Sequence, residues 1–261
     1  CIFVPLCLTT IEPADISCPS KTFVPSLLDS ESLPFLVEPP ALVFDISYSS
    51  SPDLLFDIDF TLTTEQELIR ETARDFAEKH LLPGVIERDE ASEFPKDQIK
   101  EMGELGFMGM MVPEEWGGSG FDTISYVIAI EEIAAVELAT STIMSVNNSL
   151  VCQVLLDKGT DKQKNNFLKP LARGDKLGAY SLSEPQSGSD ASNMKTYAEK
   201  NGDHYIINGT KNWVTSGQNS YFLIFFCLNN KEACSKGISA FIIEKGTPGL
   251  SIGKKENKLG I

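Results

Sequence analysis

The chain has 261 residues, of which 42% are hydrophobic and 23% are charged, and both values are ordinary for a globular protein. Its formal net charge of -15 argues against a nucleic-acid partner, because binding to phosphates requires clustered lysines and arginines. No stretch approaches the roughly 18 consecutive apolar residues that a membrane-spanning helix needs, so we expect no membrane partner.

The first predicted segment covers residues 1–61 and differs in composition from the rest. Its first 60 residues hold nine acids, eight of the 14 prolines and one basic residue, Lys21. A mitochondrial transit peptide would be rich in arginine and poor in acids, and this segment shows the reverse. We interpret it as a disordered extension without an assigned function, and we place a boundary near Leu62.

Residues 62–174 are predicted to form an all-helical domain. A capping-box pattern places the first helix start at Thr63 or Thr64, and Pro83 ends the apolar spacing that follows. Asp161 is expected to cap the last helix, which ends before a glycine. The predicted helices cover 63–82, 95–106, 122–137, 140–158 and 161–173, with a loop at 113–120.

Residues 175–261 change to a strand pattern. Two Asn-Gly pairs, at Asn201 and Asn208, are typical of hairpins in which both turn residues take a positive φ. They predict an antiparallel β-meander that includes a strand at 213–215. The continuous apolar run at 221–227 predicts a buried strand. Further strands are expected at 179–183, 205–207 and 238–243. Helices followed by strands predict an α+β fold rather than an alternating parallel-sheet fold.

Two polar clusters are the candidates for chemistry. The chain has no G-x-G-x-x-G motif and no P-loop, so a Rossmann or P-loop nucleotide site is unsupported. Residues 180–190 combine hydroxyl side chains with a glycine and could present N–H groups to a diphosphate, although such a turn is more often only solvated. Residues 213–217 place a tryptophan two positions before a threonine. This pair could stack on a ring and donate to it, or belong to the core.

Other reactive residue types give no catalytic candidate. Glu131 and Glu132 lie in an apolar helix, where neighbours point about 100° apart, so solvated or ion-paired carboxylates are expected. His80 and His204 stand alone, which is typical of surface histidines. The six cysteines include no C-x-x-C pair, so we predict no metal site and expect free thiols in a reducing compartment.

Taken together, the two polar clusters resemble the paired signature of the acyl-CoA dehydrogenase family. Tyr-Ser-Leu-Ser-Glu-Pro-x-x-Gly-Ser-Asp at 180–190 is followed by Asn-Gly-x-Lys-x-Trp-Val-Thr at 208–215. The loop at 113–120 and residues 74–79 fit the same family. Its short-chain, or butyryl-CoA, branch is resembled by residues 143–150, 236–241 and 247–261. The resemblance covers residues 62–261 almost without a gap.

This resemblance implies a three-part fold with an N-terminal helical domain, a central β-domain and a C-terminal four-helix domain. By this comparison the β-domain is incomplete at Ile261 and the C-terminal domain is missing. It also implies non-covalent FAD, a short-chain acyl-CoA substrate of fatty-acid β-oxidation, and electron-transfer flavoprotein as acceptor. The full-length relative is expected to be a homotetramer of the mitochondrial matrix.

In such enzymes a glutamate removes the α-proton while the β-hydride passes to flavin N5, which gives a trans-2-enoyl-CoA. That glutamate is expected beyond Ile261, so no catalytic residue is assigned and this chain alone is expected to be inactive. Two alternatives stay open. One is a related acyl-CoA oxidase, and the other is a truncated, non-catalytic protein that binds flavin or acyl-CoA.

Carried onto this chain, the family signature assigns nine residues to the cofactor. Ser183 is expected to bond the pyrimidine side of the flavin, Trp213 to pack on its ring and Thr215 to donate near N5. Ser189 is also expected near the acyl-CoA, and the helix at 144–150 is expected to border the acyl pocket. The nine are Tyr180, Ser181, Leu182, Ser183, Gly188, Ser189, Trp213, Val214 and Thr215.

One departure lies within the signature. The family commonly has glycine directly after Glu-Pro, whereas this chain has Gln186 followed by Ser187. Gly188 and Ser189 keep the rest of the pattern. The side chain of Gln186 could therefore crowd the flavin diphosphate.

Overall fold

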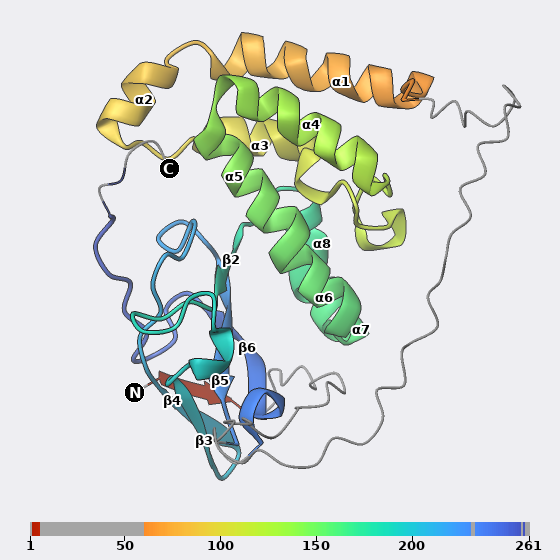
Figure 1. Ribbon diagram of the computed structural model, residues 1–261. Coiled ribbons are helices and arrows are strands. Elements are labelled where there is room, and N and C mark those ends of the chain that lie inside the picture. The colour runs from red at the N-terminus through yellow and green to blue at the C-terminus, as the bar shows by residue number, and fades with distance from the viewer. Residues whose placement is uncertain (1, 6–59, 231–232, 257, 259–261) are drawn as a thin grey trace, which may run out of the picture. The chain divides into compact units, whose positions relative to one another are not determined.

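The computed structural model of the protein describes residues 2–5, 60–230, 233–256 and 258 (Figure 1). All helices and strands below belong to one compact unit, which includes residues 2–5 and the described residues from 62 onward. Most of the predicted extension at 1–61 lies outside the described residues.

The first helix begins where the capping pattern predicts. Helix α1 (Thr64–Phe76) starts at Thr63, whose hydroxyl accepts from the Gln66 N–H at 3.2 Å, while the Gln66 side chain accepts from the Thr63 N–H at 3.1 Å. This reciprocal pair satisfies two N–H groups that the helix leaves free. The helix continues as a wider π turn (Ala77–Leu81) and ends before Pro83. The helix predicted at 63–82 is confirmed.

Helix α2 (Val85–Ala91) is not predicted by the sequence. None of its residues is buried, so it has no apolar face that hydrophobic periodicity could reveal. Arg88 attaches it to the rest of the helical part. Its side chain pairs with the buried Glu137 at 3.2 Å and donates to the Pro83 carbonyl at 2.9 Å.

The other helices follow the predicted segments, with local differences. Helix α4 is capped by Asp122, whose carboxylate accepts from the Ser125 N–H at 2.7 Å. The segment predicted as one helix at 140–158 contains a π helix in its middle, which widens the turn. The elements are α3 (Lys96–Glu104), α4 (Thr123–Val136), α5 (Leu138–Ser145), the π helix (Val146–Cys152), α6 (Gln153–Lys158), α7 (Asp161–Gln163), a π turn (Lys164–Leu168) and α8 (Lys169–Ala172).

The cap of the last helical segment corrects one expectation. Thr160, not Asp161, is the N-cap. Its hydroxyl accepts from the Gln163 N–H at 3.3 Å, and its own N–H donates to the Gln163 side chain at 2.7 Å. Threonine followed three positions later by glutamine is the same capping box as at Thr63, so the sequence carries this signal.

Two buried asparagines fasten the π helix to the apolar turn at 107–110. Asn148 accepts from the Met110 N–H and donates to the Phe107 carbonyl, both at 2.8 Å. Asn147 donates to a carbonyl of the same turn at 2.8 Å. Buried polar groups are almost always hydrogen-bonded, so these bonds fix the position of the π helix relative to the turn at 107–110.

Asn148→Ala is expected to lower the free energy of unfolding by about 2–3 kcal/mol, because the Met110 N–H and the Phe107 carbonyl lose a buried partner. Urea denaturation measures this change. The matched control is Asn165→Ala, which removes an exposed bond to the Asp161 carbonyl and should cost under about 0.5 kcal/mol. Similar losses in the two variants would contradict the role given to Asn148.

The strands form one 6-stranded sheet in the order β1-β4-β3-β5-β2, with β6 beside β5. Three pairs, β1/β4, β3/β4 and β5/β6, are antiparallel, but β2 and β3 both run parallel to β5. The α+β fold is confirmed, while the sheet is mixed rather than purely antiparallel. Strand β1 is not predicted by the sequence. The strands are β1 (Ile2–Pro5), β2 (Gly178–Ser181), β3 (Tyr197–Asn201), β4 (His204–Asn208), β5 (Phe222–Leu228) and β6 (Ile238–Glu244).

Strands β2 and β3 lie one after the other along the same edge of β5, because β6 occupies the other edge. Strand β2 pairs with β5 from Phe222 to Phe225, and β3 reaches it at Leu228. Residues 182–196 between them therefore leave the sheet and return to it. This excursion contains most of the first polar cluster, so the sheet positions both of its ends.

Only one of the two Asn-Gly pairs lies at a hairpin, and its turn differs from the predicted one. Asn201 ends β3 and pairs with His204, so the turn residues are Gly202 and Asp203. Gly202 has a φ of 64°, but Asn201 does not take a positive φ. At the second pair the chain leaves the sheet after Asn208. A Cβ at Gly209 would lie 2.2 Å from the Thr196 hydroxyl oxygen, so glycine there permits a close approach rather than a turn.

The strand predicted at 213–215 is wrong, and the β-meander does not extend beyond β4. Trp213 has a φ of 59° and Ser216 a φ of 61°, and both values are incompatible with a strand. These residues instead lead into a turn before β5.

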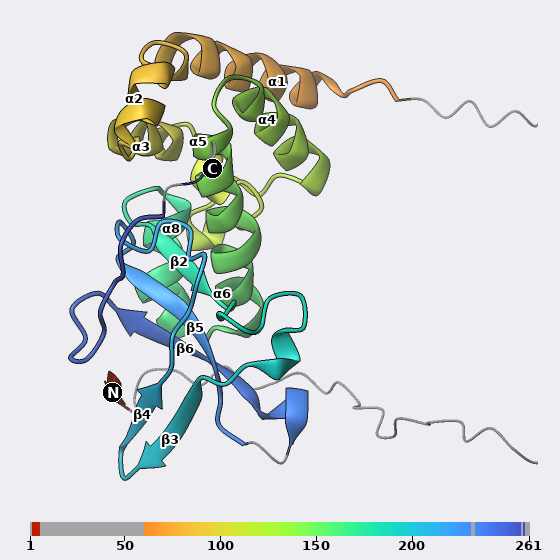
Figure 2. The same ribbon diagram turned by 60° about the vertical axis from the view of Figure 1, so that its left-hand side comes forward.

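Strand β5 is buried on both faces, as its apolar run predicts. Phe222 meets Phe167 edge-on with ring centroids 5.0 Å apart, and this contact joins the sheet to the helices. Figure 2 shows β2 and β5 beside α6 and α8. The core on this face includes Val151, Leu155, Leu168, Leu171, Phe222 and Ile224, and the other face includes Ala198, Ile207, Phe225, Phe241 and Ile243.

Within the described ranges, no helix is both long enough and apolar enough to span a membrane. The same ranges contain no group of three or more His, Cys, Asp or Glu side chains placed to hold a metal ion. Cys152 and Cys227 are free and buried. Burial raises the pKa of both thiols, that of Cys227 to about 12, so neither is a reactive thiolate at neutral pH.

Candidate functional site

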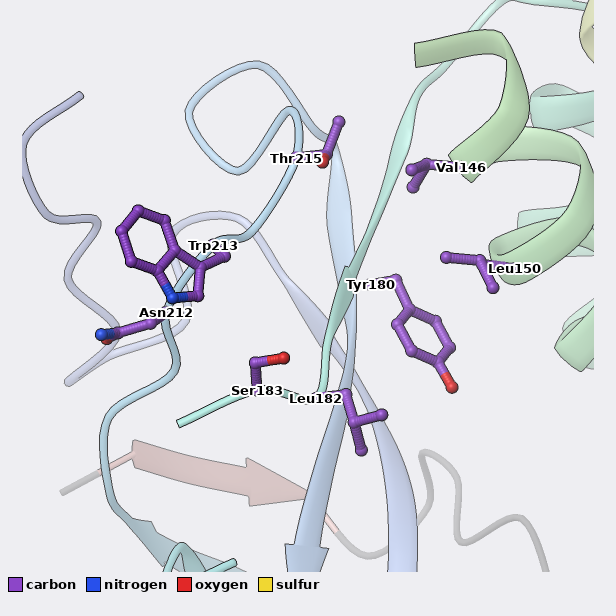
Figure 3. Close-up of a pocket in the computed structure, with 8 residues that line it drawn as sticks. All are labelled: Val146, Leu150, Tyr180, Leu182, Ser183, Asn212, Trp213 and Thr215. Carbon is purple, nitrogen blue, oxygen red and sulfur yellow. The ribbon is translucent and has the colours of Figure 1, made fainter. Parts of the chain in front are cut away.

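Three segments that are distant in the sequence meet around a cavity of about 260 Å³ (Figure 3). They are the π helix after α5, the end of β2 with the residues that follow it, and the segment after β4. The cavity therefore joins both polar clusters to the helix expected to border the acyl pocket. It is lined by Val146, Leu150, Tyr180, Leu182, Ser183, Asn212, Trp213 and Thr215.

Five of the nine residues predicted to bind the cofactor line this cavity. Figure 3 shows Trp213 on one side and the Tyr180 ring with Leu150 on the other, with the hydroxyls of Ser183 and Thr215 between them in this view. The fifth is Leu182, which follows β2 directly. Apolar rings on two sides and short hydroxyls between them suit a flat, partly polar ring.

The other four predicted residues do not line this cavity. Ser181 is fully buried within β2, and its hydroxyl has no hydrogen-bond partner among the described residues. Alternation along the strand turns it to the face opposite Tyr180. Gly188 and Ser189 are exposed, and Val214 is half-buried. The roles of all nine residues remain predictions.

Trp213 combines exposure with an unusual backbone conformation. Its side chain is 64% exposed, although tryptophan is usually buried, and its φ of 59° lies in the left-handed region. For a bulky residue this conformation costs roughly 1–2 kcal/mol, and it persists only where the surrounding structure enforces it. An exposed indole held against its own preference at the edge of a cavity indicates a surface for a ligand.

A buried ion pair connects the two signature segments behind the cavity. Lys211 Nζ lies 2.8 Å from Glu184 Oε1, and each side chain is only 2% exposed. The ammonium group also donates to the Leu182 carbonyl at 2.9 Å. One residue further on, the Asn212 N–H donates to the Ser183 carbonyl at 2.8 Å. These bonds hold residues 182–184 beside residues 211–212.

The Glu184 carboxylate is ionised in this setting. Burial by itself raises its pKa, but hydrogen bonds from the Lys195 N–H, from Lys211, Thr196 and Gln186 outweigh it and lower the pKa to about 2. Burial also raises the pKa of Tyr180, so its hydroxyl is neutral at pH 7.

Gln186 does not project freely from the turn. Its side-chain amide donates to Glu184 Oε2 at 2.6 Å, so the exposed residue that replaces the family's glycine is tied to the buried Glu184. Ser187 closes the turn, because its hydroxyl donates to the Asp190 carbonyl at 2.7 Å. The departure from the signature therefore adds a bond to Glu184.

Sequence reasoning did not single out three residues that shape this site. Asn212 lines the cavity, and Glu184 and Lys211 lie behind it. Glu184 and Lys211 each lie in one of the two signature motifs and carry opposite charges. The sequence does not indicate, however, that the two side chains are in contact. Val146 lies within the predicted 144–150 helix.

The remaining polar candidates behave as expected. Glu132 forms a two-point ion pair with Arg74, with distances of 2.9 and 2.7 Å, and so is not a free carboxylate. His80 pairs with Glu101 at 2.8 Å and stacks on Phe76 with ring centroids 5.3 Å apart. Neither residue lines the cavity.

Two domain models of one known family match most of the chain. Residues 63–175 match the description "Acyl-CoA dehydrogenase, N-terminal domain", and residues 179–261 match "Acyl-CoA dehydrogenase, middle domain". The chain belongs to the acyl-CoA dehydrogenase family. The two matches meet between 175 and 179, where the pattern changes from helices to strands.

Within this family the chain is similar to short-chain-specific members. Acyl-CoA dehydrogenase, short-chain specific, of Clostridium acetobutylicum is 46% identical over 204 residues, which are 78% of this chain and 54% of that protein. The mitochondrial short-chain specific acyl-CoA dehydrogenase of Rattus norvegicus is 45% identical over 200 residues, 77% of this chain and 48% of that protein. The chain thus spans about half the length of the curated relatives it matches.

Solved structures of the family agree with the fold. Butyryl-CoA dehydrogenase from Megasphaera elsdenii is 42% identical, with a TM-score of 0.74 over 77% of this chain and 54% of that chain. A glutaryl-CoA dehydrogenase from Mycobacterium smegmatis, in complex with FADH2, is 33% identical, with a TM-score of 0.72 over 78% of this chain and 52% of that chain. The helical and β-domains of the acyl-CoA dehydrogenase family are therefore both present.

Proposed function

We propose that this chain is part of an FAD-dependent oxidoreductase that converts short-chain acyl-CoA to trans-2-enoyl-CoA in fatty-acid β-oxidation. Membership of the acyl-CoA dehydrogenase family and similarity to short-chain-specific relatives support this reaction. The observation that carries the proposal is the cavity in which both signature segments meet. Tyr180, Leu182 and Ser183 line it from one segment, and Asn212, Trp213 and Thr215 from the other.

The donor set of the cavity fits the ring system of FAD. Aromatic and aliphatic side chains supply apolar surface, while Ser183, Asn212 and Thr215 supply hydrogen-bonding groups. The volume of about 260 Å³ lies just below the roughly 300–1,000 Å³ of pockets for drug-sized ligands. The ring, but not the whole dinucleotide, would therefore occupy it. The complex of the glutaryl-CoA dehydrogenase relative with FADH2 supports this cofactor.

The residues of this chain would bind and orient the reactants. When bound, the flavin would accept the hydride from the β carbon of the substrate. Trp213 offers an indole face for stacking, and the hydroxyls of Thr215 and Ser183 would donate to the ring. Val146 and Leu150 would exclude water from the reacting carbons. Removal of the α-proton is not assigned to any residue of this chain.

The partners follow from the family resemblance. We infer a short-chain acyl-CoA as substrate, electron-transfer flavoprotein as the acceptor and a homotetramer as the assembly. A location in the mitochondrial matrix is supported by the mitochondrial relative from Rattus norvegicus. The relative from Clostridium acetobutylicum, which is equally similar, makes a bacterial source the alternative.

Titration of the purified chain with FAD tests the cofactor assignment. We expect saturable binding with a perturbed visible flavin spectrum. Trp213→Ala should raise the Kd for FAD by roughly tenfold or more, because stacking of a planar base on an aromatic side chain is worth about 1–3 kcal/mol. Trp213→Phe keeps a ring and should lose less.

Trp116→Phe is the control, because Trp116 does not line the cavity. It should leave the Kd for FAD unchanged. The cofactor assignment fails if the parent chain does not bind FAD, or if Trp213→Ala binds it as tightly as the parent. A larger change in the bound-flavin spectrum with butyryl-CoA than with a long-chain acyl-CoA would support the short-chain assignment.

A further inference from the structure

We infer that the ion pair of Glu184 with Lys211 sets the distance between two walls of the cavity. One wall is formed by Tyr180, Leu182 and Ser183, and the other by Asn212, Trp213 and Thr215. Neither Glu184 nor Lys211 lines the cavity, so the pair acts through its neighbours. Its consequence for flavin binding rests on the proposed function, but its effect on the walls does not.

The pair acts directly on lining residues. Lys211 Nζ holds Glu184 Oε1 at 2.8 Å and the Leu182 carbonyl at 2.9 Å. Asn212, the next residue, donates its N–H to the Ser183 carbonyl at 2.8 Å. Leu182 and Ser183 belong to one wall and Asn212 to the other. The two walls are therefore joined within one residue of the cavity surface.

Glu184 also fixes the far end of the excursion from the sheet. Its carboxylate accepts from the Lys195 N–H at 2.6 Å and the Thr196 N–H at 3.0 Å, just before β3 begins. The chain at 182–184 is thus tied to its own return point at 195–196. Because both charged side chains are 2% exposed, water cannot take over these bonds when one partner is removed.

We expect the position of Trp213 to depend on this anchor. It follows Lys211 by two positions, is 64% exposed and holds a left-handed backbone. The side chain has little packing of its own to keep it in place. Loss of the bonds at Lys211 should therefore let the indole move, and a mobile indole is a poorer stacking surface.

The test uses Lys211→Met in a Trp116→Phe background. The chain has two tryptophans, so Trp213 is then the only one, and its fluorescence anisotropy reports its mobility without any flavin. We expect lower anisotropy of Trp213 and a Kd for FAD raised by about tenfold, which is 1.4 kcal/mol.

Arg88→Met in the same background is the matched control. It breaks the ion pair of Arg88 with Glu137, in which the two side chains are 12% and 9% exposed. Neither residue lines the cavity. Both variants should lower thermal stability, but only Lys211→Met should change Trp213 anisotropy. If Lys211→Met does not fold, the double variant Glu184→Gln/Lys211→Met replaces it. This double variant buries no unpaired charge, and it still lacks the hydrogen bond from residue 211 to the Leu182 carbonyl.

The inference is overturned if Lys211→Met, or its double variant, lowers stability but leaves Trp213 anisotropy at the parent value. The pair would then be purely structural. Failure of the parent chain to bind FAD is a different result. It would remove the proposed function, while the anisotropy of Trp213 would still decide whether the pair positions the walls.

Discussion

Phe222→Ala is expected to lower the free energy of unfolding by about 3–5 kcal/mol, the range for removal of a fully buried phenylalanine. Phe222 is 0% exposed and meets Phe167 with ring centroids 5.0 Å apart. It lies at the start of β5, where that strand pairs with Gly178 of β2. The variant therefore opens a void at the contact between the sheet and the helices.

The control for Phe222→Ala is the same substitution at an exposed position. Phe60 is 84% exposed, so Phe60→Ala should change stability by less than about 0.5 kcal/mol. Urea denaturation of both variants gives the comparison, and an unchanged slope would show that the unfolded state is unaffected. A loss below about 1 kcal/mol at Phe222 would mean that the core closes around the void, contrary to the packing described.

The helices that the sequence predicts are those with local signals. The capping box at Thr63 and the apolar helical pattern that begins at Asp122 place two helix starts within a residue of those observed. Helix α2 has no buried residue, and Arg88 attaches it to the distant Glu137, so local pattern could not reveal it. The π helix escapes prediction because its cause is also distant, in the bonds of the buried asparagines to the turn at 107–110.

The strands show the same division between local and distant causes. The apolar run of β5 and the turn at Gly202 are local and were predictable. Gly209 looks like a second hairpin signal, yet Thr196, more than ten residues away, is what requires glycine there. Parallel pairing of β2 with β5 likewise depends on tertiary contact and not on any turn motif.

The convergence of the two signature segments followed from the family resemblance, and the cavity brings five of the nine assigned residues together. The resemblance did not indicate how the segments are joined. Glu184 and Lys211 are 27 positions apart and carry opposite charges, a combination too common in sequences to be diagnostic. Only the burial of both side chains identifies the pair as a constraint on the site.

We expect a low pH to remove the stability that the ionised Glu184 carboxylate contributes to the folded chain. The pKa of Glu184 is about 2 in the folded chain against an ordinary value of 4.5. A carboxyl whose pKa is lower when folded contributes stability that is fully present above its unfolded pKa. That contribution is lost as the pH falls through the folded pKa, here between 4.5 and about 2.

Glu184→Gln separates this contribution from that of the other carboxylates, which titrate alike in both proteins. The free energy of unfolding of the parent should exceed that of Glu184→Gln near neutral pH, and the difference should shrink steadily below about pH 4.5. Asp75→Asn is the control. It removes an ion pair with Lys79 in which both side chains are 64% exposed, and it should change stability by less than about 1 kcal/mol at each pH. A difference between parent and Glu184→Gln that stays constant down to about pH 3 would show that the pKa of Glu184 is the same in the folded and unfolded chain, and the buried network would then not favour the ionised carboxylate.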